Sequence, residues 1–287
     1  MRYLAAITLI WALSFNLIGE YLAGRVDSDF AVLTRVLLAG VVFLPFTRWR
    51  GIPWQRITGT MLAGALQFGV TYLLLYRSFA WLTVPEVLLF TIFTPIFITL
   101  IDDAFERRFT LRTSVAALIA IAGSLIIRYN DIGGDFLTGF LMLQLANLSF
   151  ALGQVGYKRL LQRYPTTLPA SASFGWFFAG ALLIALPSFL LFGNAARLPS
   201  TALQWGVLVY MGLASSALGF YWWNKGATLV DAGILGAMNN MHIPTGIAIH
   251  MLLWNSHEDL LRLLAGGAVI AFALWLNGYW QKHWQQR

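Results

Sequence analysis

The sequence predicts an all-α polytopic membrane protein. Of its 287 residues, 59% are hydrophobic and only 11% are charged, whereas soluble domains carry about 25% charged residues. A globule of this length could not bury so much apolar surface in one core and stay dissolved. The apolar residues also form continuous runs, and about 20 helical residues suffice to cross a bilayer. Because the chain has no cysteine, a secreted disulfide scaffold is excluded.

Ten apolar runs are expected to form transmembrane helices. They are continuously apolar rather than alternating, which favours helices over the strands of a barrel. The first run follows Arg2 and is too long for a signal peptide, so we expect it to be retained. Only Phe79 and Ala80 separate the third and fourth runs. The expected spans are 3–23, 29–47, 56–78, 81–101, 112–128, 136–157, 169–192, 201–224, 231–252 and 260–281.

The basic residues predict the orientation of these spans. With the N-terminus in the cytoplasm, 13 Lys and Arg fall on the inner side and 5 on the outer side, and Arg35 lies inside a span. Positive residues concentrate on the cytoplasmic side of membrane proteins, so both termini are expected to be cytoplasmic. The same asymmetry explains the net charge of +7 without a nucleic-acid partner. The lipid bilayer is the expected surrounding.

Ten spans divide into two units of five, which we place at residues 1–130 and 131–287. Because five is odd, the second unit enters the membrane in the opposite sense, as in many secondary transporters. Two weak sequence echoes support this: Leu13–Phe15 resembles Leu148–Phe150, and Pro95 corresponds to Pro244. No phosphate-binding loop with the Gly-x-x-x-x-Gly-Lys pattern occurs, and no ATPase subunit is implied.

Four ionisable residues are expected in the outer half of the first unit, where burial in lipid is costly. They could form a vestibule whose arginines attract a carboxylate, or they could neutralise one another as structural ion pairs. Arg35 is the deepest and the best candidate for binding; Glu86 could instead carry a proton. The four are Glu20, Arg35, Arg77 and Glu86, of which the two acids are candidates for coupling or for the vestibule.

A second polar group is expected near the middle of the membrane. Pro244 removes a backbone donor and is expected to break the ninth span, and broken helices at this depth often bind substrate. Simple hydrogen bonding between helices is the alternative. Aromatic side chains could line the pocket or only pack. The candidates for substrate binding here are Asn147, Asn239, Asn240 and His242, with the aromatic residues Tyr76 and Trp223.

Other functions find less support in the residues. With four His, no Cys and no close cluster at depth, we expect neither a metal nor a cofactor. No nucleophile lies at helical spacing from a histidine base, so we do not expect an enzyme. Glycines are expected to let helices approach closely; these are Gly59, Gly64, Gly69, Gly266 and Gly267.

Ten spans with Arg35 in the second, Pro95 in the fourth and Pro244 in the ninth resemble the EamA family of the drug/metabolite transporter superfamily over essentially the whole chain. More distinctive strings resemble the biotin transporters of the bacterial inner membrane. That resemblance implies uptake of biotin, a small carboxylate-bearing vitamin, across the cytoplasmic membrane. Export of amino acids or other small metabolites remains the alternative. The strings are Gly19–Gly24, Glu86–Thr91, Val155–Leu160, Val230–Gly233 and Met238–His242.

Overall fold

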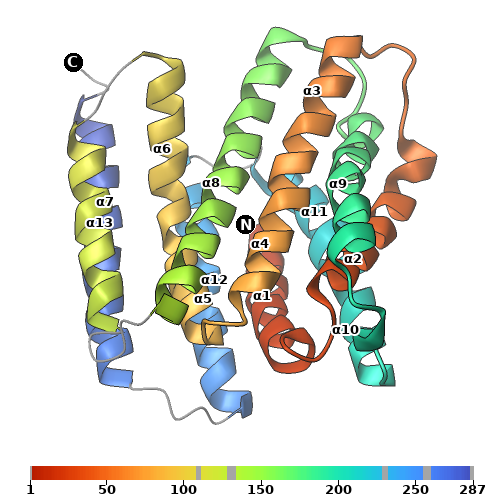
Figure 1. Cartoon of the computed structure of the whole chain (residues 1–287). Coiled ribbons are helices and arrows are strands. Elements are labelled where there is room, and N and C mark those ends of the chain that lie inside the picture. The colour runs from red at the N-terminus through yellow and green to blue at the C-terminus, as the bar shows by residue number, and fades with distance from the viewer. Residues whose placement is uncertain (1, 108–110, 128–133, 228–231, 255–259, 285–287) are drawn as a thin grey trace.

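A computed structural model of the chain shows a bundle of helices (Figure 1). It describes residues 2–107, 111–127, 134–227, 232–254 and 260–284, and these contain no strand. The helices of the first half are α1 (Arg2–Leu17), η1 (Ile18–Leu22), α2 (Ser28–Phe43), η2 (Leu44–Phe46), α3 (Trp54–Gly64), η3 (Ala65–Val70), α4 (Thr71–Ser78), α5 (Val84–Phe90), η4 (Thr91–Phe93), α6 (Thr94–Phe105) and α7 (Leu111–Ile127).

The second half is also helical throughout its described residues. Its helices are α8 (Gly134–Arg163), α9 (Ser171–Phe192), η5 (Ala195–Arg197), α10 (Ala202–Tyr210), η6 (Met211–Leu218), α11 (Gly219–Ala227), α12 (Ala232–Trp254) and α13 (Leu260–Trp284). Helix occupies the described residues of each of the ten apolar ranges expected from the sequence, and α4 and α5 are separate, in agreement with the expected division at Phe79 and Ala80.

The bundle has the surface of a multi-pass membrane protein. Seven helical stretches among the described residues are long and apolar enough to cross a membrane. Large apolar side chains lie exposed along the outside, such as Leu191 at 74% and Leu252 at 82% exposure. A soluble protein rarely exposes so much apolar surface, whereas lipid tails accept it. The prediction of an all-helical membrane protein is therefore confirmed for the described residues.

Helices from the two halves of the chain interleave. Helix α7 packs along α13 at one edge of the bundle, and α2 packs against α9 at the opposite edge (Figure 1). Between these edges, α1 packs against α11 and α12, while α8 packs against α4 and α6. Helix α3 also packs against α9. The centre of the bundle is therefore built from both halves.

Close helix contacts depend on glycine, as the sequence predicts. A Cβ atom on Gly64 would lie 2.0 Å from the carbonyl oxygen of Phe177, and one on Gly59 would lie 2.6 Å from Leu160. A Cβ on Gly69 would lie 2.9 Å from Ile184. Real side chains do not approach this closely, so the helices touch backbone to backbone where glycine permits it.

Several spans depart from α-helical geometry near the centre of the bundle. The π-helical segments η3 and η6 lie within the third and eighth spans, the π-helical η1 ends the first span, and the 3₁₀ segment η4 precedes Pro95, which lies at the start of α6. Such irregular turns are frequent at functional sites because they redirect side chains and free backbone groups. The expected break at Pro244 is wrong: α12 runs through this proline without interruption.

Candidate binding cavity

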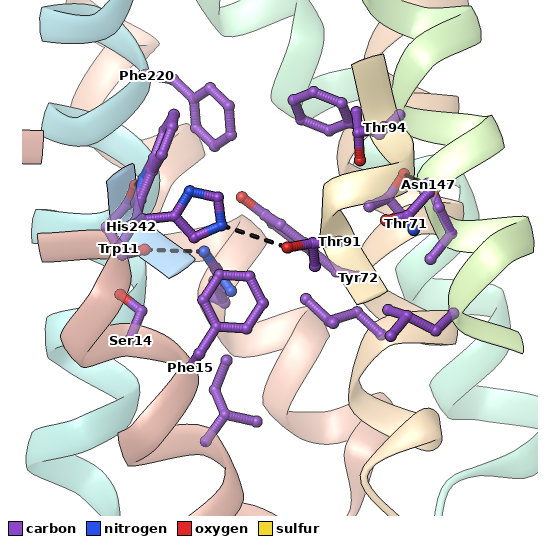
Figure 2. A pocket seen from close by; sticks show the side chains of 17 residues that line it. Trp11, Ser14, Phe15, Thr71, Tyr72, Thr91, Thr94, Asn147, Phe220 and His242 are labelled. Atoms are coloured by element: carbon purple, nitrogen blue, oxygen red, sulfur yellow. Dashed lines mark hydrogen bonds between the residues drawn. The ribbon is translucent and has the colours of Figure 1, made fainter. Parts of the chain in front are cut away.

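A cavity of about 120 Å³ lies among the irregular segments, where helices of both halves meet. Figure 2 shows His242, Trp11 and Ser14 on one side of it, facing Thr91, Thr94 and Asn147 on the other. Most of the wall is apolar and aromatic, and a few polar groups point inward. Small-molecule sites in proteins have this composition, because apolar walls bind the body of a ligand and polar groups fix its orientation.

Arg35 is the charged residue of the cavity wall. Its side chain is 4% exposed, and its Nε donates to Ser216 Oγ at 2.6 Å while Nη2 donates to Ser215 Oγ at 3.0 Å. The guanidinium also lies over the ring of Tyr72, with Cζ 3.8 Å from the ring centre. Two serines and one aromatic face therefore hold the cation in a fixed orientation, and among the described residues Nη1 and the second hydrogen of Nη2 have no hydrogen-bond acceptor.

The positive charge of Arg35 has no carboxylate beside it. Within the described ranges, no acidic side chain lies within the 4.0 Å of an ion pair with this residue. Nearby Tyr76 is buried, and its hydroxyl, which interacts electrostatically with Arg35, has no hydrogen-bond partner there. A buried cation without a counter-ion is costly unless a ligand neutralises it. The arrangement fits a carboxylate ligand.

Asn147 presents an acceptor on the opposite wall. Its Nδ2 donates to the carbonyl oxygen of Phe90 at 2.9 Å and to Gln144 Oε1 at 3.2 Å. Both amide hydrogens are thus used, and Oδ1 has no donor among the described residues. Gln144 Nε2 is also buried without a partner there. Gln144 does not line the cavity, so its part is to hold Asn147 in place, and the acceptor that Asn147 presents suits a ligand with an N–H donor.

His242 extends from α12 into the cavity, as the sequence predicts. Its Nε2 lies 3.4 Å from Thr91 Oγ1 (Figure 2), and its ring stacks on Phe15 with centres 5.6 Å apart. Thr91 uses its own hydrogen to bond the carbonyl oxygen of Leu88 at 2.6 Å, so His242 Nε2 must be the donor between them. The histidine thereby links α12 to the irregular segment η4.

Arg77, the second arginine expected at a carboxylate, does not line the cavity. Its Nη2 lies 2.7 Å from Asp29 Oδ1, and Asp29 also accepts a short hydrogen bond from Ser188. This ion pair joins α2, α4 and α9. The four ionisable residues grouped by the sequence therefore do not pair in the expected way: Arg77 is neutralised by an acid near the start of its neighbouring span.

Glu20 and Glu86, the two acids predicted for coupling or for the vestibule, lie outside the cavity wall. Glu86 begins α5: its carboxylate accepts from the backbone N–H of Thr83 at 2.8 Å, in a capping box. Such a cap stabilises a helix start by about 1 kcal/mol. Glu20 lies in η1, with Oε1 3.8 Å from His250 Nδ1.

The remaining predicted residues are distributed around the cavity. Trp223 lines a second, smaller cavity of about 50 Å³ that shares Phe150 and Phe220 with the first. Asn240 is half-buried on α12 and does not line either cavity, and the side chain of Asn239 lies outside what the structure describes.

Residues that the sequence analysis did not select complete the wall. Ser215 and Ser216 hold Arg35, and Trp11 donates from Nε1 to the carbonyl oxygen of Ser215 at 3.1 Å. The sequence feature that could have selected Ser215 and Ser216 is their position as two adjacent serines within an apolar span. Among the described residues, no cluster of three His, Cys, Asp or Glu side chains could hold a metal ion.

The fold and the cavity define a class: a multi-pass membrane protein with a site for a small, partly polar solute between its two halves, as in secondary transporters. The chain belongs to the EamA-like transporter family, whose model matches residues 2–129 and 137–278. A solved structure described only as the crystal structure of a protein shares the fold, with a TM-score of 0.65 at 15% identity, over 97% of this chain and 96% of that one.

Curated relatives match nearly the full chain. A probable biotin transporter of Pseudomonas aeruginosa is 62% identical over 96% of this chain and 97% of its own. A biotin transporter of Escherichia coli K12 is 47% identical over 98% of this chain and 93% of its own, as is one of Salmonella typhimurium. The family consists of transporters, in agreement with the expectation that the chain is not an enzyme.

Proposed function

We propose that this protein is a secondary transporter that carries biotin into the cell across the bacterial cytoplasmic membrane. The observation that carries the proposal is Arg35, a buried guanidinium in the cavity wall without a carboxylate partner among the described residues. The relatives named as biotin transporters, at 47–62% identity, favour biotin over the amino acids or other metabolites of an exporter.

The chemistry of biotin fits the groups around the cavity. An arginine can bind a carboxylate with two parallel hydrogen bonds, and the hydroxyl of Tyr76 could donate a third. The cyclic urea of biotin carries N–H donors, which the Oδ1 of Asn147, without a donor among the described residues, would accept. Phe15 and Trp11 supply apolar surface for the ring system.

We further propose ten membrane spans in two inverted units of five, at residues 1–130 and 131–287. The helix contacts support this division. Exchanging the two units converts the contact of α4 with α8 into that of α11 with α1, and the contact of α6 with α8 into that of α12 with α1; all four occur. Likewise the η3–α9 contact corresponds to that of η6 with α2. The two family-matched segments divide the chain at the same place.

In this arrangement both termini are cytoplasmic, as the distribution of basic residues predicts. Transport would follow from rocking of the two units around the cavity, which would open it to each side in turn. The second cavity would lie on the inward path, because Tyr157 on its wall is near the end of α8 that leads to the cytoplasmic loop. Phe150 and Phe220, shared by both cavities, would separate the site from that path.

Uptake by the purified chain in liposomes tests this function. We expect saturable uptake of labelled biotin at nanomolar concentration without ATP, displaced by unlabelled biotin and not by amino acids. Liposomes without protein are the control. Uptake of amino acids with no response to biotin would overturn the biotin assignment, and a requirement for an ATP-hydrolysing partner would overturn the secondary mechanism.

A second prediction concerns Asn147, which lies on the cavity wall opposite Arg35. Replacing Asn147 with leucine removes the acceptor for the urea, so the KM for biotin should rise about tenfold, the cost of one lost hydrogen bond to a buried group. A straight-chain fatty acid has the carboxylate and lacks the urea. Its inhibition constant should not change in this variant, so the preference for biotin over the fatty acid should shrink by the same factor. An equal loss for both compounds would show instead that Asn147 only holds the helices together.

A further inference from the structure

A buried polar cluster lies outside the cavity, between the end of α1 and the C-terminal half of α12. His250 Nδ1 is 3.0 Å from Asn16 Oδ1 and 3.8 Å from Glu20 Oε1. His250 and Asn16 are 5% and 0% exposed, whereas the Glu20 side chain is 30% exposed. Gly19 beside it packs on Val84 at the start of α5, so the cluster lies at the end of the bundle that carries the α4–α5 connection.

Hydrogen bonds of Asn16 determine which nitrogen of His250 carries a proton. Asn16 Nδ2 donates to the carbonyl oxygens of Ala12 at 2.9 Å and Gly246 at 3.0 Å. Its Oδ1 is therefore the atom that faces His250, and Nδ1 of the histidine must donate to it. The neutral histidine thus holds its proton on Nδ1. Further proton uptake takes place on Nε2 and produces an imidazolium.

Glu20 is the carboxylate positioned to respond to that charge. The elements packed against α12 are α1, α5 and η4. From α5, the acid Glu86 accepts from Thr83 of its own cap, and η4 contributes Thr91, which contacts His242. Tyr21, beside Glu20, meets the edge of Trp254, which stacks on His250 with ring centres 6.1 Å apart. Protonation of His250 therefore places a positive charge beside the Glu20 carboxylate and makes the pair neutral.

The two helices that form the cluster also form the cavity. Helix α12 carries His242 about two turns before His250, and α1 carries Ser14 and Phe15 between one and two turns before Glu20. Glu20 itself lies in the π-helical η1, a geometry frequent at functional sites. The charge of the cluster thus changes the contact between two walls of the binding site.

We propose that His250 and Glu20, held by Asn16, bind the proton that enters together with the substrate, so that the protein is a proton symporter. This inference rests on the proposed function. The proton enters from the side of the α4–α5 connection, where Glu20 is partly exposed and which the basic residues place outside, and it binds His250. The pair is then neutral and can be desolvated as α1 and α12 close, whereas an unpaired carboxylate resists burial. Histidine suits this role because its charge changes near physiological pH.

Two transport assays in liposomes distinguish proton coupling from the binding of biotin. Accumulation of labelled biotin is driven by a pH gradient, acidic outside; exchange of labelled for unlabelled biotin needs no gradient. In the wild type we expect accumulation to rise with the gradient and to collapse with a protonophore. In Glu20→Gln and His250→Gln, gradient-driven accumulation should fall at least about tenfold while exchange stays within about twofold. Retained exchange shows that the variants are folded.

Glu86→Gln is the matched control, since it neutralises a buried acid near the same end of the bundle and keeps an acceptor for the cap. It should retain accumulation. If Glu86→Gln loses accumulation and Glu20→Gln keeps it, the coupling site is not the one proposed. Biotin accumulation by the wild type that does not depend on the pH gradient would also overturn the inference, while leaving the transport function intact. Absence of biotin exchange by the wild type would overturn the transport function itself.

Discussion

Replacing Arg35 with alanine is expected to raise the KM for biotin at least about 30-fold, without unfolding the protein. The guanidinium is buried and oriented by Ser215 and Ser216. Loss of one partner from a desolvated charge pair costs about 2 kcal/mol or more, which corresponds to a factor of about 30. Alanine also removes a buried charge that the free protein must hold unpaired. The folded state should therefore lose little stability, and only binding should suffer.

Three comparisons test whether Arg35 binds the carboxylate of biotin. Arg35→Lys keeps the charge and loses the two-pronged geometry, so it should recover only part of the affinity. Arg77→Ala removes an arginine of the same bundle that pairs with Asp29 instead, and should leave the KM within about threefold while reducing thermal stability. Biotin methyl ester has no charge, and its weak binding should be equal in wild type and Arg35→Ala. Discrimination between acid and ester that survives in Arg35→Ala would place the carboxylate elsewhere.

The helices could be predicted from the sequence because lipid constrains them locally. Any apolar run of this length must satisfy its backbone internally, so the helix ranges follow from the runs themselves. The ends of the helices are predicted less well. Helix α8 continues to Arg163, whereas the expected span ends at residue 157. There Arg159 bonds Asp102 at 2.8 Å, so a contact between spans supports helix beyond the apolar run.

The candidate cavity was predicted in part. The depth of Arg35 in its span favoured it, but depth alone did not exclude Arg77 as a second candidate for the carboxylate. The distinction depends on Asp29, which lies 48 residues away from Arg77 in sequence and meets it through tertiary packing. Pro244 was misleading for a related reason. Proline removes only the donor to the carbonyl oxygen of Asn240, and α12 continues through it within the packed bundle.

Gly180→Ala is expected to destabilise the protein by forcing two helices apart. A Cβ at this position would lie 1.8 Å from the carbonyl oxygen of Met61, and the reciprocal contact places a Cβ on Gly64 at 2.0 Å from that of Phe177. Both obstacles are backbone atoms, which cannot rotate away as a side chain can. Helices α3 and α9 would have to move apart at the point where they cross.

The cost of such overpacking is about 1–3 kcal/mol, and the apparent unfolding temperature should fall by about 5–10 °C. Gly156→Ala is the matched control, because a Cβ there meets nothing within 4 Å; the added methyl should leave stability unchanged or raise it slightly. Separation of α3 and α9 also displaces α4, whose Tyr72 lies against Arg35. Biotin affinity should therefore fall together with stability in Gly180→Ala, and an equal melting temperature in the two variants would contradict the close backbone contact.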